Sequence, residues 1–207
     1  AKSSHSVPDK LDTKMVFQSL DFFYFFIIVY TVFWVNSFAE RIKISFPSFK
    51  IYKYFLLIAS YYFYAYWDYR FLSLIIISTL LDFWIGGKIF QYHDRKKKKL
   101  YLILSVFINL SILGFFKYCN FFTESANYLL QSWSISLPLL EIILPIGISF
   151  YTFQSMSYSL DIYFKKLEPT ERLLDFALYV AFFPQLVAGP IVRARDFLPQ
   201  LLYPQKY

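Results

Sequence analysis

A stripe of polar side chains follows one face of an apolar segment near residue 150. Read as a helix, the stretch LPIGISFYTFQSMSYSLDIYF repeats Gly147, Tyr151, Gln154, Tyr158 and Asp161 at alternating spacings of four and three. Two phenols, an amide and a carboxylate can donate or accept hydrogen bonds, and they are costly in hydrocarbon. They therefore face a polar cavity or a substrate, or they bond to the polar groups of neighbouring helices. Both alternatives stay open at this point.

A second segment, YVAFFPQLVAGPIVRARDFLPQL, interrupts an apolar run with prolines and polar residues. Pro184 and Pro190 lack the N–H that a helix interior needs, so we predict a kink or an end at each. Gly189 allows a close approach of another backbone or a ligand, and Gln185 adds donors and an acceptor at the same place. Carbonyl groups released at membrane depth need partners from protein or water. We predict a broken helix that is shielded from lipid and lines something polar, followed directly by Arg193.

The composition indicates an integral membrane protein built from helices. Hydrophobic residues make up 57% of the 207 residues and charged residues only 17%, against about a quarter in soluble domains. A helix needs about 20 apolar residues to cross a bilayer. The apolar runs predict an all-α fold with about six transmembrane helices, some short or broken by proline. These runs cover 16–38, 54–67, 71–90, 100–116, 138–163 and 173–192.

The basic residues gather between these runs, and the net charge is +7. Counted on alternate sides of the predicted spans, 13 of the 21 Lys and Arg residues fall on one side, which includes the tetralysine stretch 96–99. The positive-inside rule makes that side cytoplasmic and places the N-terminus outside the cell membrane. We interpret the tetralysine stretch as a loop that anchors the topology at anionic lipid. Because the charges are dispersed between apolar runs, we expect no nucleic-acid partner.

Two other polar faces are interpreted as packing surfaces. Asp82 shares a helical face with Gly86, and we expect its carboxylate to bond to a neighbouring helix rather than to line a cavity. Thr152, Ser155 and Ser159 form a surface of small side chains that suits close helix packing.

The cysteine and histidine content predicts neither an internal disulfide nor a metal site. Cys119 is the single cysteine, and His5 and His93 lie far apart in polar segments. The first 14 residues form a polar tail that need not be native, and residues 15–207 form one membrane domain.

Four blocks of the sequence resemble the membrane-bound O-acyltransferase family, in particular the N-terminal portion of the bacterial branch that O-acetylates alginate. They are MVFQSLDFFYFF, ASYYFYAYWDYRFL, LPIGISFYTFQSMSYSLDIY and FFPQLVAGPIVRARDFLPQL, in the family's order. The resemblance implies part of a helical ring around a tunnel in the bacterial inner membrane. An acyl group, most simply acetyl, would pass from a donor to hydroxyls of an extracytoplasmic polysaccharide such as alginate. The donor would be acetyl-CoA or a carrier-bound acyl thioester, with no bound cofactor, and accessory O-acetylation proteins would be partners.

The family's catalytic histidine, in a Trp-His-x-Ser block, lies downstream of the last of these blocks. Nothing similar occurs before Tyr207, so the resemblance implies a chain truncated before its catalytic residue and inactive alone. It implies a tunnel lining and a structural break instead. The lining is Tyr151, Gln154, Tyr158, Asp161, Gln185 and Arg193, and the break is Pro184, Gly189 and Pro190.

Two alternatives use the same residues differently. The chain could be a small membrane transporter or channel subunit, with the polar stripe and the broken helix as its permeation path. It could also be a non-catalytic remnant that folds in the bilayer.

Overall fold

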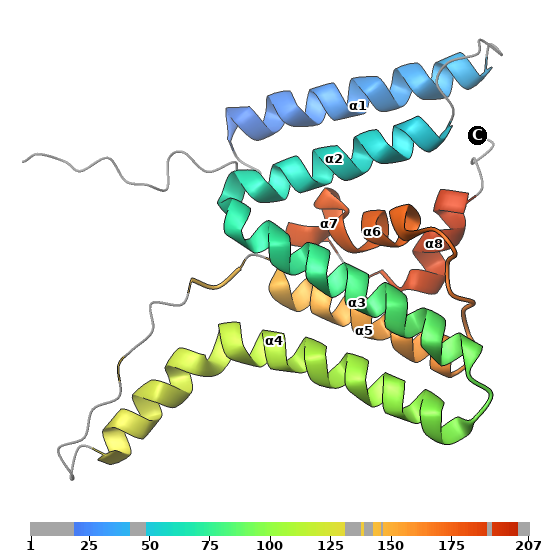
Figure 1. Ribbon diagram of the computed structural model, residues 1–207. Coiled ribbons are helices and arrows are strands. Elements are labelled where there is room, and N and C mark those ends of the chain that lie inside the picture. Colours follow the sequence, from blue (N-terminus) through green and yellow to red (C-terminus); the bar gives the residue numbers. More distant parts are fainter. Residues whose placement is uncertain are drawn as a thin grey trace, which may run out of the picture.

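The computed structural model describes residues 19–41, 49–130, 138, 143–145, 147–189 and 192–202, and every regular element within these ranges is a helix. Helices α1 (Leu20–Arg41) and α2 (Phe49–Asp68) lie side by side (Figure 1). The short 3-10 helix η1 (Tyr69–Phe71) then leads into α3 (Leu72–Gln91). The prediction of an all-α fold is confirmed. The polar tail 1–14 lies outside the described residues.

Three longer helices pack against one another, and three short ones cover them. Helix α3 packs with α4 (Arg95–Leu130) and α5 (Ile148–Tyr163). The chain then forms α6 (Leu173–Ala181), α7 (Phe183–Ala188) and α8 (Ala194–Leu202). Helix α6 packs on both α2 and α3, so the short helices lie between the α1–α2 pair and the α3–α5 group (Figure 1).

Helix α4 is longer than the sequence predicts, and the tetralysine stretch belongs to its first turns rather than to a loop. Asp94 starts the helix, because its Oδ1 accepts a hydrogen bond from Lys96 N at 2.9 Å and its carbonyl accepts one from Lys98 N at 3.0 Å. The helix also continues to Leu130, past the predicted end at 116. Residues 131–137, which follow α4, lie outside the described residues.

Helix α5 begins later than the apolar run that starts at 138 predicts. Gly147 stands before its first turn with φ 74, in the left-handed region that side chains disfavour. The helix therefore starts at Ile148 and ends at Tyr163. The last predicted run, 173–192, is divided into α6 and α7.

Two helical stretches of the described chain, Ile51–Gln91 and Arg95–Leu130, are long and apolar enough to cross a membrane. Shorter apolar stretches cover Leu20–Asn36 and Leu173–Leu186. Of the most apolar window of Arg95–Leu130, only 17% is buried within the described protein. The number of spans, their ring and their orientation stay predictions.

Candidate functional site

The polar side chains of α5 are buried. Tyr151, Gln154, Tyr158 and Asp161, which we call the polar face, have exposed fractions of 0%, 1%, 0% and 7%. Helix α5 packs against α3 and α4 and also contacts α6, α7 and α8. The polar face is therefore enclosed by protein rather than placed on the surface.

The broken helix meets this face through Gln185. Helix α6 ends at Ala181, and Phe182 leaves the helical conformation (φ −58, ψ 107). Helix α7 starts at once with Pro184 in its first turn, where a missing N–H leaves no hydrogen bond unmade. The Phe182 carbonyl accepts hydrogen bonds from Gln185 N at 3.0 Å and Leu186 N at 3.2 Å. Gln154 Nε2 then donates to Gln185 Oε1 at 3.1 Å. The two segments that the sequence predicts as lining thus meet side chain to side chain.

A close approach between α5 and α7 holds this arrangement. A Cβ atom on Gly147 would lie 2.5 Å from the carbonyl oxygen of Leu186, closer than any side chain tolerates. Gly147 also has φ 74. Its lack of a side chain is needed both for the backbone conformation and for the contact with α7.

Tyr158 is fixed from three sides. Its hydroxyl accepts a hydrogen bond from Thr170 N at 3.2 Å, in the loop after α5. Its ring packs against Phe176 of α6 in a tilted arrangement, with a centroid distance of 4.3 Å and 37° between the ring planes. On the third side lies Gly86 of α3, where a Cβ would be 2.6 Å from Tyr158 Cε1.

Part of the polar face carries polar atoms without protein partners. Within the described part of the chain, Tyr151 Oη, Gln154 Oε1 and Asp161 Oδ2 are buried and accept or donate no hydrogen bond. Buried polar atoms are nearly always paired with protein or water. The face is therefore only partly a satisfied network between helices, and these atoms are available to water or to a polar ligand.

The other predicted site residues are placed differently. The Arg193 side chain is exposed, and its carbonyl accepts hydrogen bonds from Asp196 N at 3.0 Å and Phe197 N at 3.1 Å at the start of α8. A Cβ on Gly189 would lie 2.7 Å from Gln185 Cα, so the close approach there is within α7's own last turn. Pro190 lies outside the described residues.

Tyr179 of α6 belongs to the site, and it is not among the residues predicted from the sequence. Its hydroxyl donates to the Val192 carbonyl at 3.0 Å, and it lies 3.4 Å from both the Gln154 carbonyl and Ser157 Oγ. Tyr179 therefore connects α6 to α5 and to the segment after α7. The sequence does contain a signal for it, because Asp175 and Tyr179 are two polar residues four positions apart in the apolar stretch LLDFALYV.

Lys53 and Asp175 form a second feature that is not predicted from the sequence. Lys53 Nζ lies 2.6 Å from Asp175 Oδ1, and the two side chains are 3% and 0% exposed. Lys53 precedes the predicted span 54–67, which places it between two spans, but in the structure it lies inside α2 and bonds to α6.

The structural interpretation of Asp82 is confirmed. Its carboxylate accepts hydrogen bonds from Ser105 Oγ at 2.7 Å and from Asn109 Nδ2 at 3.0 and 2.9 Å, both on α4. Ser105 Oγ also bonds to Ser159 Oγ at 3.0 Å, so the small side chains of α5 take part. This network joins α3, α4 and α5.

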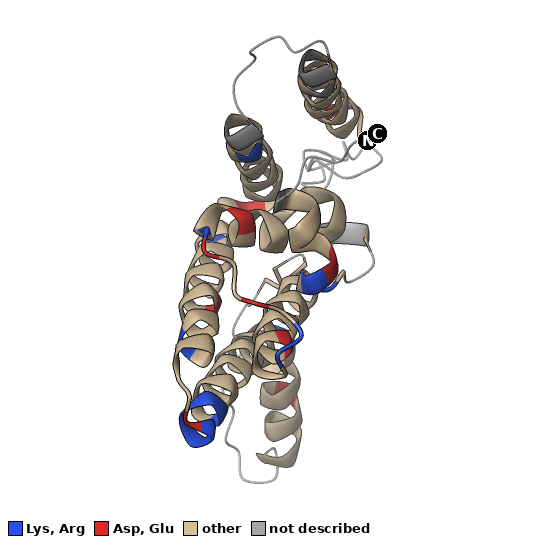
Figure 2. Cartoon of the chain, turned by 90° about the vertical axis from the view of Figure 1, so that its right-hand side faces the viewer, with Lys and Arg blue, Asp and Glu red and all other residues tan. Residues whose placement is uncertain are grey.

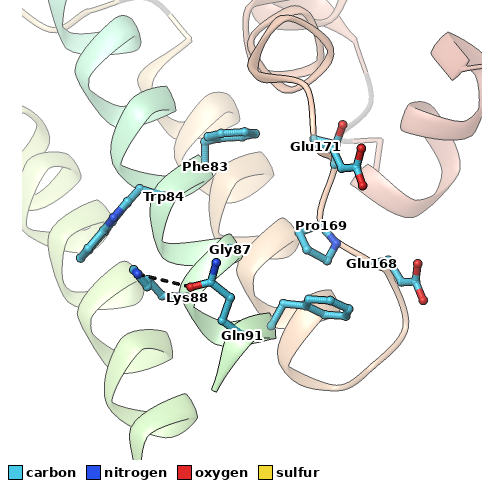
Figure 3. A pocket seen from close by; sticks show the side chains of 10 residues that line it. Phe83, Trp84, Gly87, Lys88, Gln91, Glu168, Pro169 and Glu171 are labelled. Atoms are coloured by element: carbon cyan, nitrogen blue, oxygen red, sulfur yellow. Dashed lines mark hydrogen bonds between the residues drawn. The ribbon is translucent and has the colours of Figure 1, made fainter. Parts of the chain in front are cut away.

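A groove of about 460 Å³ lies between α3 and the loop after α5. Figure 3 shows Phe83 and Trp84 on one wall, Glu168 and Glu171 on the other, and the hydrogen bond between Lys88 Nζ and Gln91 Oε1 at 3.3 Å. Its lining includes Thr170, the hydrogen-bond partner of Tyr158. Among the described residues, no three His, Cys, Asp or Glu side chains are close enough to hold a metal ion.

Comparison with known proteins identifies relatives by sequence. A probable alginate O-acetylase of Pseudomonas syringae pv. tomato is 46% identical over 70% of this chain and 28% of its own length. The corresponding protein of Pseudomonas aeruginosa shows the same identity and coverage. A peptidoglycan O-acetyltransferase of Helicobacter pylori is 36% identical over 72% of this chain and 32% of its own length. The chain thus spans about 30% of the length of these relatives. No family model matches the chain, and no solved structure matches it significantly.

Proposed function

The chain is a homologue of the alginate O-acetylases over 70% of its length, and from that premise we propose that it forms part of an O-acetyltransferase. The reaction moves an acetyl group from a thioester to a hydroxyl of an extracytoplasmic polysaccharide, so that an ester forms and a thiol leaves. The donor is acetyl-CoA or a carrier-bound thioester. Alginate and peptidoglycan are the acceptors named for the relatives, and a polymer of this kind is the proposed acceptor here.

The observation that carries this proposal is the contact between the polar face and the broken helix. Acyl transfer needs the acceptor hydroxyl held against the thioester carbonyl and hydrogen-bond donors near the oxygen that becomes negative. The pair Gln154–Gln185 joins two amide groups at 3.1 Å, and the nearby partnerless hydroxyl of Tyr151 can donate. We propose that these groups line the tunnel wall and position a substrate there.

Proton transfer is assigned to none of these residues. A general base for a hydroxyl is most often a histidine. Of the histidines in the chain, His93 is the one that the structure describes, and it lies in the turn between α3 and α4. We therefore propose that a histidine outside the polar face accepts the proton. Arg193 is proposed to line the tunnel at a place away from the pair Gln154–Gln185.

The chain is further proposed to cross the bacterial inner membrane several times, as part of a helical ring with its N-terminus outside the cytoplasm. Two helical stretches of suitable length and apolarity support the membrane crossings. Helix α4 also exposes large apolar side chains that lipid would cover, among them Ile103, Phe107, Leu110, Phe121 and Phe122. The proposed partners are the lipid bilayer, the polysaccharide and accessory O-acetylation proteins.

The test is genetic and chemical. The gene that encodes this chain is deleted, and alkali-labile acetate on the cell's exopolysaccharide and on its peptidoglycan is measured separately. The proposal expects acetate to fall on one of the two polymers and to return when the gene is restored. Unchanged acetate on both polymers contradicts it.

A further inference from the structure

A second hollow of about 420 Å³ lies where the start of α4 meets the end of α5. We call it the basic pocket, and it is lined by His93, Arg95, Lys98, Tyr163, Phe164 and Lys165. Three permanent cations therefore line one hollow, and no carboxylate is among its lining residues. Figure 2 shows Lys and Arg gathered at this end of the helix group.

These cations lack a counter-charge in the described protein. No described carboxylate lies within ion-pair distance of Arg95, Lys98 or Lys165. The nearest acidic residue in sequence, Asp94, uses its Oδ1 to cap the helix at Lys96 N. Like charges held together repel one another, so a bound anion would stabilise this arrangement.

Neighbouring lysines behave differently. Lys97 lies over the ring of Tyr92, with 5.3 Å from Nζ to the centroid, and Lys166 lies over Phe164 at 5.8 Å. Neither residue lines the basic pocket. The lysine-rich stretch is therefore not uniform, because Lys98 lines the pocket and Lys97 packs on an aromatic ring outside its lining.

The backbone of Lys165 adds an independent observation. It has φ 58, the one positive φ outside glycine among the described residues. The hydrogen bonds that end α5, from Lys165 N to Ile162 O at 3.0 Å and from Lys166 N to Asp161 O at 2.8 Å, form the helix end that glycine usually completes. A lysine here costs backbone energy, and such strain is concentrated at functional positions.

From the pocket, its cations and this strained lysine, we propose that the basic pocket binds the phosphate groups of an anionic ligand. Arg95 offers a planar set of donors to phosphate oxygens, Lys98 supplies a further charge from α4, and Lys165 supplies one from the turn after α5. The phosphate can belong to a soluble diphosphate-bearing molecule or to the headgroup of an anionic phospholipid. The proposal does not depend on acetyl transfer.

The experiment uses the full-length protein in nanodiscs of phosphatidylcholine, titrated with inorganic pyrophosphate by calorimetry. Lys165→Gly and Lys98→Gln are each expected to weaken binding about tenfold, the loss of one charge-assisted contact. Lys165→Gly should leave the melting temperature unchanged or raise it, since glycine suits φ 58. Lys97→Gln is the matched control and should bind as the wild type does.

A second arm separates the two sources of phosphate. Nanodiscs with phosphatidylglycerol are analysed by native mass spectrometry for retained lipid. If the headgroup is the ligand, pyrophosphate binds weakly, whereas phosphatidylglycerol is retained by the wild type and by Lys97→Gln but lost from Lys98→Gln and Lys165→Gly. The proposal is overturned if neither probe binds, or if Lys97→Gln weakens binding as much as Lys98→Gln.

Discussion

Lys53 and Asp175, which are 122 residues apart in the sequence, form a buried ion pair with 2.6 Å between Nζ and Oδ1. The pair joins α2 to α6, the helix that leads into the break at Phe182 and carries Tyr179. It therefore fixes the helix that directly precedes α7, and Gln185 of α7 contacts the polar face. Removing one partner of a buried pair is far more costly than removing both, because the remaining charge stays uncompensated.

Lys53→Met is expected to destabilise the protein by about 3–5 kcal/mol, because it leaves the Asp175 carboxylate buried without its cation. Thermal unfolding in detergent measures this as a lowered melting temperature. The double variant Lys53→Met/Asp175→Leu should recover most of the loss. A double variant as unstable as the single one would show that the pair is not the cause.

Gly86→Ala should destabilise the packing of α3 on α5. The added methyl would lie 2.6 Å from Tyr158 Cε1 and 3.0 Å from Ile162 Cδ1, and such overpacking costs about 1–3 kcal/mol. Gly87→Ala is the control one residue away, where no atom lies within 4 Å of the new Cβ. Equal melting temperatures for the two variants would contradict the close contact with Tyr158.

Gly147→Ala should separate α5 from α7. The new Cβ would meet the Leu186 carbonyl oxygen at 2.5 Å, and alanine is strained at φ 74. We expect destabilisation of at least about 1 kcal/mol and a large loss of O-acetylation, measured as alkali-labile acetate. Gly114→Ala, which meets no atom within 4 Å, should keep both stability and acetate, and a Gly147→Ala protein with full acetate would argue against the α5–α7 contact.

Asn109→Leu tests the network around Asp82. The substitution removes two hydrogen bonds, at 3.0 and 2.9 Å, from a buried carboxylate, and we expect a cost of about 2–3 kcal/mol. The Asp82→Asn change in the same chain should recover part of it, because the buried group is then neutral. No change in the melting temperature of Asn109→Leu would contradict the role of this network.

The sequence predicted the parts of the site that depend on local spacing. The alternation of four and three residues from Gly147 to Asp161 placed the polar face on one side of a helix, and the structure shows that side buried. The isolated Asp82 in an apolar run likewise predicted a partner on another helix. Both inferences need only the helical repeat and the cost of burying polar groups.

Tertiary contacts between distant segments were beyond sequence reasoning. Lys53 lies near the start of an apolar run, where a lysine usually extends to water, so its burial against Asp175 could not be inferred. The pairing of Gln154 with Gln185 requires the α5–α7 approach that Gly147 allows. The continuity of α4 was missed because polar side chains were taken to end it, whereas Thr123 Oγ1 donates to the Cys119 carbonyl within the helix at 3.0 Å.

The central claim is that the contact of α7 with the polar face serves O-acetylation, and Gln185→Leu tests it most directly. Acetate esters on the extracytoplasmic polymer are measured in cells that carry this variant, with protein level and melting temperature measured in parallel. Gln200→Leu is the control, because Gln200 is exposed on α8 and donates to the Asp196 carbonyl of its own helix at 2.8 Å. We expect Gln185→Leu to lower the acetate at least about tenfold at normal protein level, with Gln200→Leu unchanged. A folded Gln185→Leu protein that supports full acetylation would contradict the account.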